Sequence, residues 1–181
     1  MRNKIIIFGR SPFINKIDFN KIDYDKYSIC CINTVNPNLK QVNYVVSTDY
    51  NVIFPHDRKF EWISPYTNWL FLGTNEPYYV EERKLSWCYF SSSIAVSFAI
   101  LRGYKEIYLA GIDLDGDDKF EHYDSKPVIL KNGFDKCYAE REFIKNICYE
   151  YGVKVFTLNI NNDWVKFKDV GIIKNDSQEN K

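Results

Sequence analysis

The residues best suited to bind a phosphate group follow the first apolar segment of the sequence. Gly9, Arg10 and Ser11 come directly after the apolar residues 5–8. A glycine lets the backbone approach a ligand closely, and an arginine guanidinium pairs with a phosphate through its fork of donors. The GxGxxG spacing of dinucleotide-binding loops and the GxxxxGKS/T spacing of P-loops are both missing. The segment therefore predicts either a phosphate-binding turn or an ordinary glycine turn with a surface arginine.

Three consecutive serines form a second candidate for anion binding. Ser91, Ser92 and Ser93 precede the apolar residues 94–101, which end near Gly103. This order is typical of a helix with a hydroxyl cap and a glycine stop. The free N–H groups at a helix N-terminus favour an anion, and serine hydroxyls add hydrogen bonds to it. Plain capping needs only one of the serines, and the sequence leaves both interpretations open.

Single polar residues follow other apolar segments of strand length. Asn33, Asp49 and Asp113 each lie shortly after such a segment. Ligands of open parallel sheets bind outside the carboxyl ends of the strands, where residues in these positions lie. Their common position predicts one pocket, shared with the loop at Gly9.

An acidic turn and two histidines complete the candidate chemistry. Asp113, Asp115, Asp117 and Asp118 lie within six residues. Such carboxylates bind Mg²⁺, often together with substrate phosphates, although exposed turn residues give the same pattern. The histidines are His56 and His122. His122 lies just beyond the acidic turn, where it is a candidate general base or an idle loop residue.

Alternating strands and helices are predicted to position these residues. Apolar segments indicate strands at 4–8, 27–32, 43–47, 106–110 and 153–157, with weaker candidates at 60–63 and 69–72. Helices are predicted over 91–101 and 135–151. The alternation favours a single α/β domain of Rossmann-like type over residues 1–170, with a mainly parallel sheet and helices on both faces. Residues 171–181 are predicted to form a flexible tail.

The charge and composition of the sequence indicate which kinds of partner and which location to expect. Lys and Arg total 24 and Asp and Glu total 24, so the formal net charge is zero, and we expect no nucleic-acid partner. No apolar segment is long enough for a signal-peptide core or a membrane span. Five cysteines without CxxC spacing indicate reduced thiols in a cytoplasmic protein. An oligomer is possible.

Two segments resemble a known family. Residues 92–113 read SSIAVSFAILRGYKEIYLAGID, and residues 5–12 read IIIFGRSP. Both are similar to bacterial sialyltransferases of the Campylobacter type (glycosyltransferase family 42). More loosely, the chain resembles the MptE-like family of pterin pyrophosphokinases. Of the two segments, only residues 92–113 form a specific match.

The sialyltransferase resemblance implies a glycosyltransferase that moves a CMP-activated sugar to a saccharide acceptor without an obligatory metal. It implies that Gly9, Ser11, Asn33, Ser92 and Ser93 line the nucleotide and its phosphate. Arg10, Asp49 and Asp113 complete our predicted nucleotide-binding set.

The family's catalytic histidine has no counterpart here. It lies just before the last helix, where this chain has Phe134, Asp135 and Lys136. Either Asp135 or His122 acts as the base, or the protein binds a nucleotide without catalysis. The MptE-like resemblance implies a different reaction, in which Asp49 and Asp113 hold Mg²⁺ for pyrophosphoryl transfer from ATP.

Overall fold

A computed structural model describes residues 2–47, 60–63, 88–115, 119–120, 128–129 and 131–174. The regular elements within these ranges alternate between strands and helices, as the sequence predicts. In chain order they are β1 (Lys4–Phe8), the 3-10 helices η1 (Pro12–Lys16) and η2 (Phe19–Lys21), β2 (Tyr27–Ile32), β3 (Tyr44–Val46), β4 (Glu61–Ile63), α1 (Ser91–Leu101), β5 (Glu106–Ala110), β6 (Lys119–Phe120), β7 (Val128–Ile129), α2 (Gly133–Glu150) and β8 (Lys154–Thr157).

Six of the strands form one sheet in the order β4-β3-β2-β1-β5-β8, and every pairing in it is parallel. β6 and β7 form a separate antiparallel pair. The predicted strands 4–8, 27–32 and 106–110 have the observed bounds. The weaker candidate at 69–72 lies outside the described residues.

β1 lies in the middle of the sheet because both of its faces are apolar. Ile5, Ile6 and Ile7 are fully buried. Ile5 and Ile7 pack on the side of the sheet that α1 and α2 cover, and Ile6 packs on the opposite side. A continuous apolar segment is the pattern expected of a parallel strand buried on both faces. Adjacent Cys30 and Cys31 of β2 also point to opposite faces.

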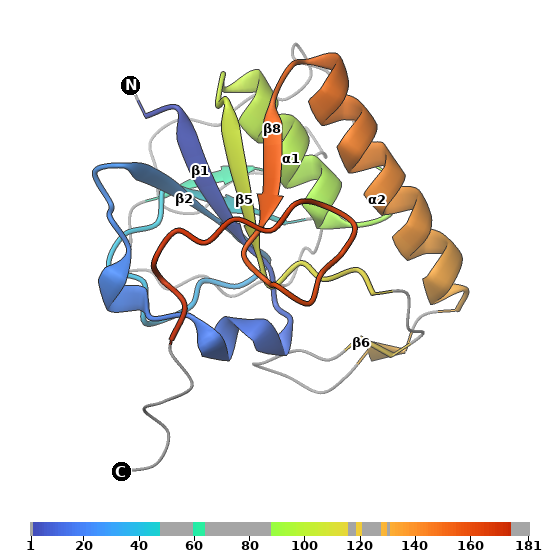
Figure 1. Cartoon of the computed structure of the whole chain (residues 1–181), viewed down its shortest axis with the longest axis horizontal. Helices are drawn as coiled ribbons and strands as arrows, with labels where there is room; N and C mark the ends of the chain where they lie inside the picture. Colours follow the sequence, from blue (N-terminus) through green and yellow to red (C-terminus); the bar gives the residue numbers. More distant parts are fainter. Residues whose placement is uncertain are drawn as a thin grey trace.

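The two faces of the sheet are covered differently. Helices α1 and α2 lie together on one side (Figure 1). The described cover of the other side consists of η1, η2, the segment between β2 and β3, and the segment after β8, which crosses the strands. The predicted helices on both faces are therefore present, but those on the second face are short 3-10 helices.

The C-terminal segment belongs to the packed domain as far as Lys174. Ile172 is 1% exposed, and Ile173 forms an antiparallel bridge with Ile17. Lys174 N donates to Lys16 O over 2.8 Å. Residues 171–174 therefore do not form the start of a flexible tail, and the remaining tail residues lie outside the described part of the chain.

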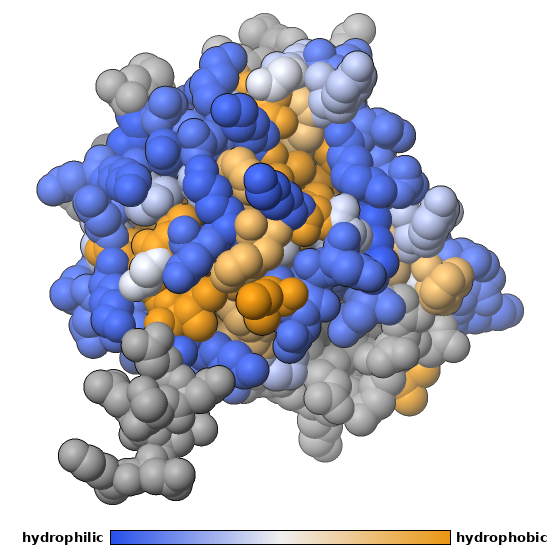
Figure 2. All heavy atoms as spheres, viewed as in Figure 1, coloured by the Kyte–Doolittle hydropathy of each residue, from blue (hydrophilic) through white to orange (hydrophobic). Residues whose placement is uncertain are grey.

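The surface viewed in Figure 2 is hydrophilic around its rim, with apolar side chains in its middle over β8 and the C-terminal segment. Ile160, which follows β8, is 72% exposed. None of the helices described is long and apolar enough to cross a membrane.

Candidate functional site

The strand order changes direction at β1, which creates the switch point where ligands of such sheets bind. From β1 the chain first adds β2, β3 and β4 on one side, and later β5 and β8 on the other. After β1 the chain continues to strands on one side, and after β5 it continues to β8 on the other. A crevice at the carboxyl ends of these two strands is the expected ligand position. These ends lie toward the lower edge of the sheet in Figure 1.

Two glycines let the loops at this switch point touch. Gly9 N donates to Ala110 O over 2.8 Å, and Ser11 N donates to Gly111 O over 3.1 Å. A Cβ atom on Gly9 would lie 2.2 Å from Gly111 O, so no side chain fits there. Gly111 has a φ of +66°, in the left-handed region that favours glycine. Both glycines are thus required by the backbone, whether or not a ligand is present.

The residues after Gly9 begin η1 at this edge. Ser11 is the N-cap of η1, and its Oγ accepts a hydrogen bond from Phe13 N over 3.3 Å. Arg10, which lies between Gly9 and Ser11 in the sequence, is half-buried. The structure therefore brings Gly9, Arg10 and Ser11 to the switch point, as predicted, and gives Ser11 a capping role there.

Asn33 lies at the carboxyl end of β2, beside β1, and both its backbone conformation and its side-chain environment are unusual. Its backbone has a φ of 62°, and its N–H donates to Val46 O over 2.8 Å. Its side-chain Oδ1 is buried and accepts no hydrogen bond from the described residues. A buried acceptor without a donor costs about 1–3 kcal/mol. A ligand N–H or O–H donor at this position would recover that free energy.

Asp113 joins the loop after β5 to the segment after β8. Its Oδ1 accepts a hydrogen bond from Asn159 Nδ2 over 3.0 Å. Its carbonyl oxygen accepts from Trp164 Nε1 over 2.9 Å and from Asn162 Nδ2 over 3.3 Å. These contacts hold the loop after β5 against the segment after β8. Sequence reasoning missed the three donors, because nothing in their spacing links them to residue 113.

The three serines of α1 meet a carboxylate from within the protein. Glu140 of α2 is 0% exposed. Its Oε1 accepts from Ser92 Oγ over 2.6 Å and from Ser93 N over 2.7 Å. Its Oε2 accepts from Tyr89 N over 2.9 Å and from Phe90 N over 3.3 Å.

The contacts of Glu140 differ from both interpretations of these serines, which were binding of a ligand anion and plain helix capping. The anion at the start of α1 is a side chain, so in this structure Ser92 and Ser93 are occupied and do not face a ligand phosphate. Ser93 Oγ instead donates to Phe90 O over 2.9 Å. The sequence does carry a signal for Glu140: it shares a helix face with the buried Cys137, Ile144 and Cys148. A carboxylate on such a face needs a buried set of donors.

The two candidate bases are placed unequally. Asp135 is exposed in the first turn of α2. Because α2 runs back to the amino end of β8, its start lies toward the carboxyl edge of the sheet (Figure 1). His122 and Asp49 lie outside the described residues, as do Asp117 and Asp118. Among the residues described, no three histidine, cysteine or carboxylate side chains gather in a possible metal site.

No protein-family model matches the sequence, and no curated protein matches it either. Solved structures do match. Sialyltransferase CstII from Campylobacter jejuni, in complex with the substrate analogue cytidine-5'-monophosphate, has a TM-score of 0.58 at 16% identity, over 96% of this chain and 90% of that chain.

Two further structures agree. The monofunctional alpha-2,3-sialyltransferase Cst-I from Campylobacter jejuni has a TM-score of 0.56 at 15% identity, over 97% of this chain and 85% of that chain. CST-II in complex with a trisaccharide acceptor and CMP has a TM-score of 0.56 at 17% identity, over 95% and 91% of the two chains. The chain thus has the fold of these sialyltransferases, as the resemblance implies.

Proposed function

We propose that this protein is a glycosyltransferase-like enzyme that binds a CMP-activated sugar in the crevice at the carboxyl ends of β1 and β5. The observation that carries the proposal is the buried Oδ1 of Asn33 at the neighbouring strand end, which accepts no hydrogen bond within the described part of the chain. The fold adds support, because similar solved structures contain CMP. Binding of the nucleotide next to Asn33 would supply the missing donor.

The loops of the crevice suit the two parts of a nucleotide-sugar. Gly9 packs against Gly111 O, which holds the loop after β1 at this edge of the sheet. Arg10 is the cation of this loop, and its guanidinium matches a phosphate. Asn33, which follows β2, would then contact the nucleoside. Ser92 and Ser93 stay with Glu140 and take no part in this proposal.

The transfer itself needs a base for the acceptor hydroxyl. In an inverting transfer, the acceptor oxygen bonds to the anomeric carbon while the bond from that carbon to the phosphate oxygen breaks. CMP leaves with the electron pair, and the base takes the proton of the acceptor hydroxyl. Asp135 and His122 are the candidates for this role.

Calorimetry with CMP, CDP, GDP and ATP tests the binding site. We expect cytidine nucleotides to bind, and Asn33→Gly to weaken CMP binding about tenfold, the effect of one hydrogen bond of about 1.4 kcal/mol. Glycine keeps the left-handed backbone of this position. Asn132→Gly is the matched control, because Asn132 also has a positive φ but is exposed. Absence of binding by every cytidine nucleotide would overturn the proposal.

Turnover of a CMP-activated sugar acid tests catalysis. We expect Asp135→Asn or His122→Ala to abolish transfer and to retain CMP binding, since a base acts on the acceptor and not on the nucleotide. CMP binding without any transfer by the wild-type protein would reduce the function to nucleotide binding. The Mg²⁺-dependent alternative predicts that ATP binding strengthens with Mg²⁺, but no contact of the described residues favours it.

A further inference from the structure

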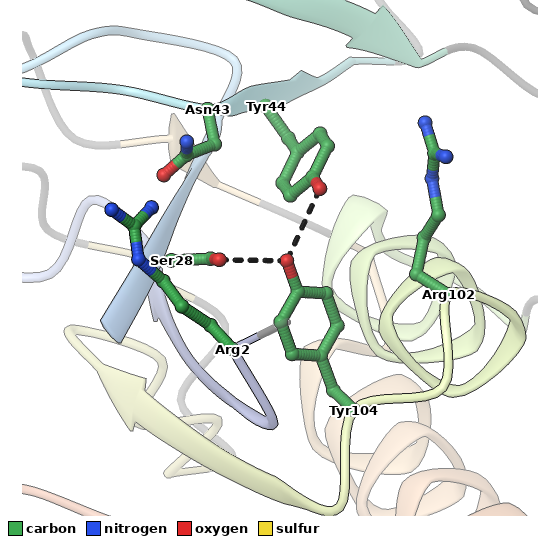
Figure 3. A pocket seen from close by; sticks show the side chains of 6 residues that line it. All are labelled: Arg2, Ser28, Asn43, Tyr44, Arg102 and Tyr104. Carbon is green, nitrogen blue, oxygen red and sulfur yellow. Dashed lines mark hydrogen bonds between the residues drawn. The ribbon is translucent and has the colours of Figure 1, made fainter. Parts of the chain in front are cut away.

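A second polar pocket lies at the opposite edge of the sheet, at the amino ends of the strands. Its volume is about 350 Å³, and its lining comes from the segment before β1, from β2, from the start of β3 with the residue before it, and from the segment between α1 and β5. The lining residues are Arg2, Ser28, Asn43, Tyr44, Arg102 and Tyr104 (Figure 3). β1 separates this pocket from the Gly9 loop.

A row of three hydroxyl groups crosses the pocket (Figure 3). Tyr104 O–H donates to Ser28 Oγ over 2.7 Å, and the hydroxyl oxygens of Tyr44 and Tyr104 are 3.1 Å apart. Because Tyr104 uses its one proton on Ser28, Tyr44 donates to Tyr104. This order leaves the Ser28 proton as the donor at the end of the row. Ser28 is also a polar residue within the otherwise apolar buried strand β2, so the row accounts for its presence there.

Two further donors converge on Ser28. Asn43 Oδ1 accepts from Ile29 N over 2.8 Å, which leaves the Asn43 amide N–H groups for the pocket. Arg2 Nε donates to Asp25 O over 3.1 Å, which holds the guanidinium in place. Figure 3 shows the Arg2 head group next to Asn43 and Ser28.

A second cation lies beyond the tyrosine ring. The Arg102 guanidinium stacks 5.6 Å from the centroid of Tyr44 and 5.4 Å from that of Phe98. The lining residues thus carry two positive charges and no negative one. Around Ser28 they present hydrogen-bond donors, which suits a ligand made of acceptors.

We propose that this pocket binds a compact oxyanion, the phosphate or carboxylate group of a small molecule, through the Arg2 guanidinium, the Ser28 hydroxyl and the Asn43 amide. Charge-assisted bonds from a guanidinium are about twice as strong as neutral ones, so Arg2 supplies the largest part of the affinity. The site is separate from the nucleotide crevice, and its occupation does not depend on the function proposed for that crevice.

Backbone amide NMR during titration with inorganic phosphate tests the site, with sodium acetate as the carboxylate probe. We expect shifts at residues 28, 43 and 104. Arg2→Gln should weaken phosphate binding at least about tenfold through loss of the charged hydrogen bonds. Arg10→Gln is the matched control, because it removes an arginine at the other end of β1, and it should leave these shifts unchanged. Tighter binding of phosphate than of acetate would assign a phosphorylated ligand, and the reverse would assign a carboxylate.

Shifts confined to the Gly9 loop, or equal binding by wild type and Arg2→Gln, would overturn the proposal. Ser28→Ala provides an independent check, since it removes one donor without a change of charge. Its phosphate binding should fall by a smaller factor than that of Arg2→Gln. An unchanged affinity in Ser28→Ala would contradict the role of the hydroxyl row.

Discussion

One carboxylate on each face of the sheet has several partners, and the kind of interaction that stabilises it differs between the two faces. Glu140, on the face covered by α1 and α2, is 0% exposed, and it accepts hydrogen bonds from three backbone N–H groups and one hydroxyl. Glu106 of β5, on the opposite face, has a side chain 20% exposed. It accepts from Tyr108 O–H and lies 3.0 Å from Lys168 Nζ and 3.5 Å from Lys4 Nζ.

Neutral hydrogen-bond donors stabilise the Glu140 carboxylate, whereas charged lysines stabilise the Glu106 carboxylate. The donors to Glu140 are neutral groups at the start of α1, where the helix dipole favours a negative charge. Because Glu140 is buried, dissolved salt screens these interactions only weakly. Near the edge of the sheet, lysines pair with Glu106, and Lys168 also lies 4.3 Å from the centroid of the Phe156 ring. Glu140 thereby joins two helices, and Glu106 joins β5 to the C-terminal segment.

The largest expected effect is at Glu140. Glu140→Ala leaves the buried Ser92 hydroxyl and Ser93 N–H and two part-buried N–H groups without their acceptor, so we expect a loss of about 3 kcal/mol or more in the free energy of unfolding. Denaturant unfolding measures it. Glu142→Ala on the same helix is the control, since its side chain is 39% exposed and pairs with Lys145, and its loss should stay within about 0.5 kcal/mol. Equal losses in both variants would contradict the role of Glu140.

A pH series addresses Glu106. The hydrogen bond from Tyr108 and the charges of Lys168 and Lys4 lower the pKa of Glu106 from 4.5 to about 2, against the effect of burial. A carboxyl with a lowered folded-state pKa stabilises the fold fully above its unfolded pKa. This contribution is lost as the pH falls from about 4.5 to 2. We expect Glu106→Gln to be less stable than wild type at pH 7 and to show a flatter stability curve over that window. Parallel curves for the two proteins would contradict the assignment.

The smallest effect is expected at Lys168. Its side chain is 40% exposed, so Lys168→Gln should cost at most about 1 kcal/mol. The loss should shrink as NaCl rises toward about 1 M, where the Debye length is about 3 Å. The loss in Glu140→Ala should persist there. A salt-independent effect at Lys168 would show that packing on Phe156, and not charge, stabilises this contact.

The strands at the centre of the sheet were predictable because their burial on two faces leaves a continuous apolar segment. The cover of the second face was not, since η1, η2 and residues 171–174 are too short or irregular to show a periodic pattern. Ile172 illustrates this: it is 1% exposed, but the short apolar segment around it has neither the length nor the period of a helix or a strand.

The candidate site was predictable only in part. The positions of Gly9 and Asn33 follow from the ends of their strands, which are local in sequence. The partners of Ser92 and Asp113 do not, because Glu140 and Asn159 lie 48 and 46 residues further along the chain. A buried hydrogen bond across such a separation depends on how helices and loops pack, and propensity gives no information about that.

The pairing of β1 with β5 has a bearing on synthesis. Residues 4–8 pair with residues 106–110, so one edge of β1 waits for its neighbour until more than half of the chain has left the ribosome. During that interval Ile5, Ile6 and Ile7 present an apolar strand edge that other nascent chains can capture. A chaperone that binds short hydrophobic segments would find a target here.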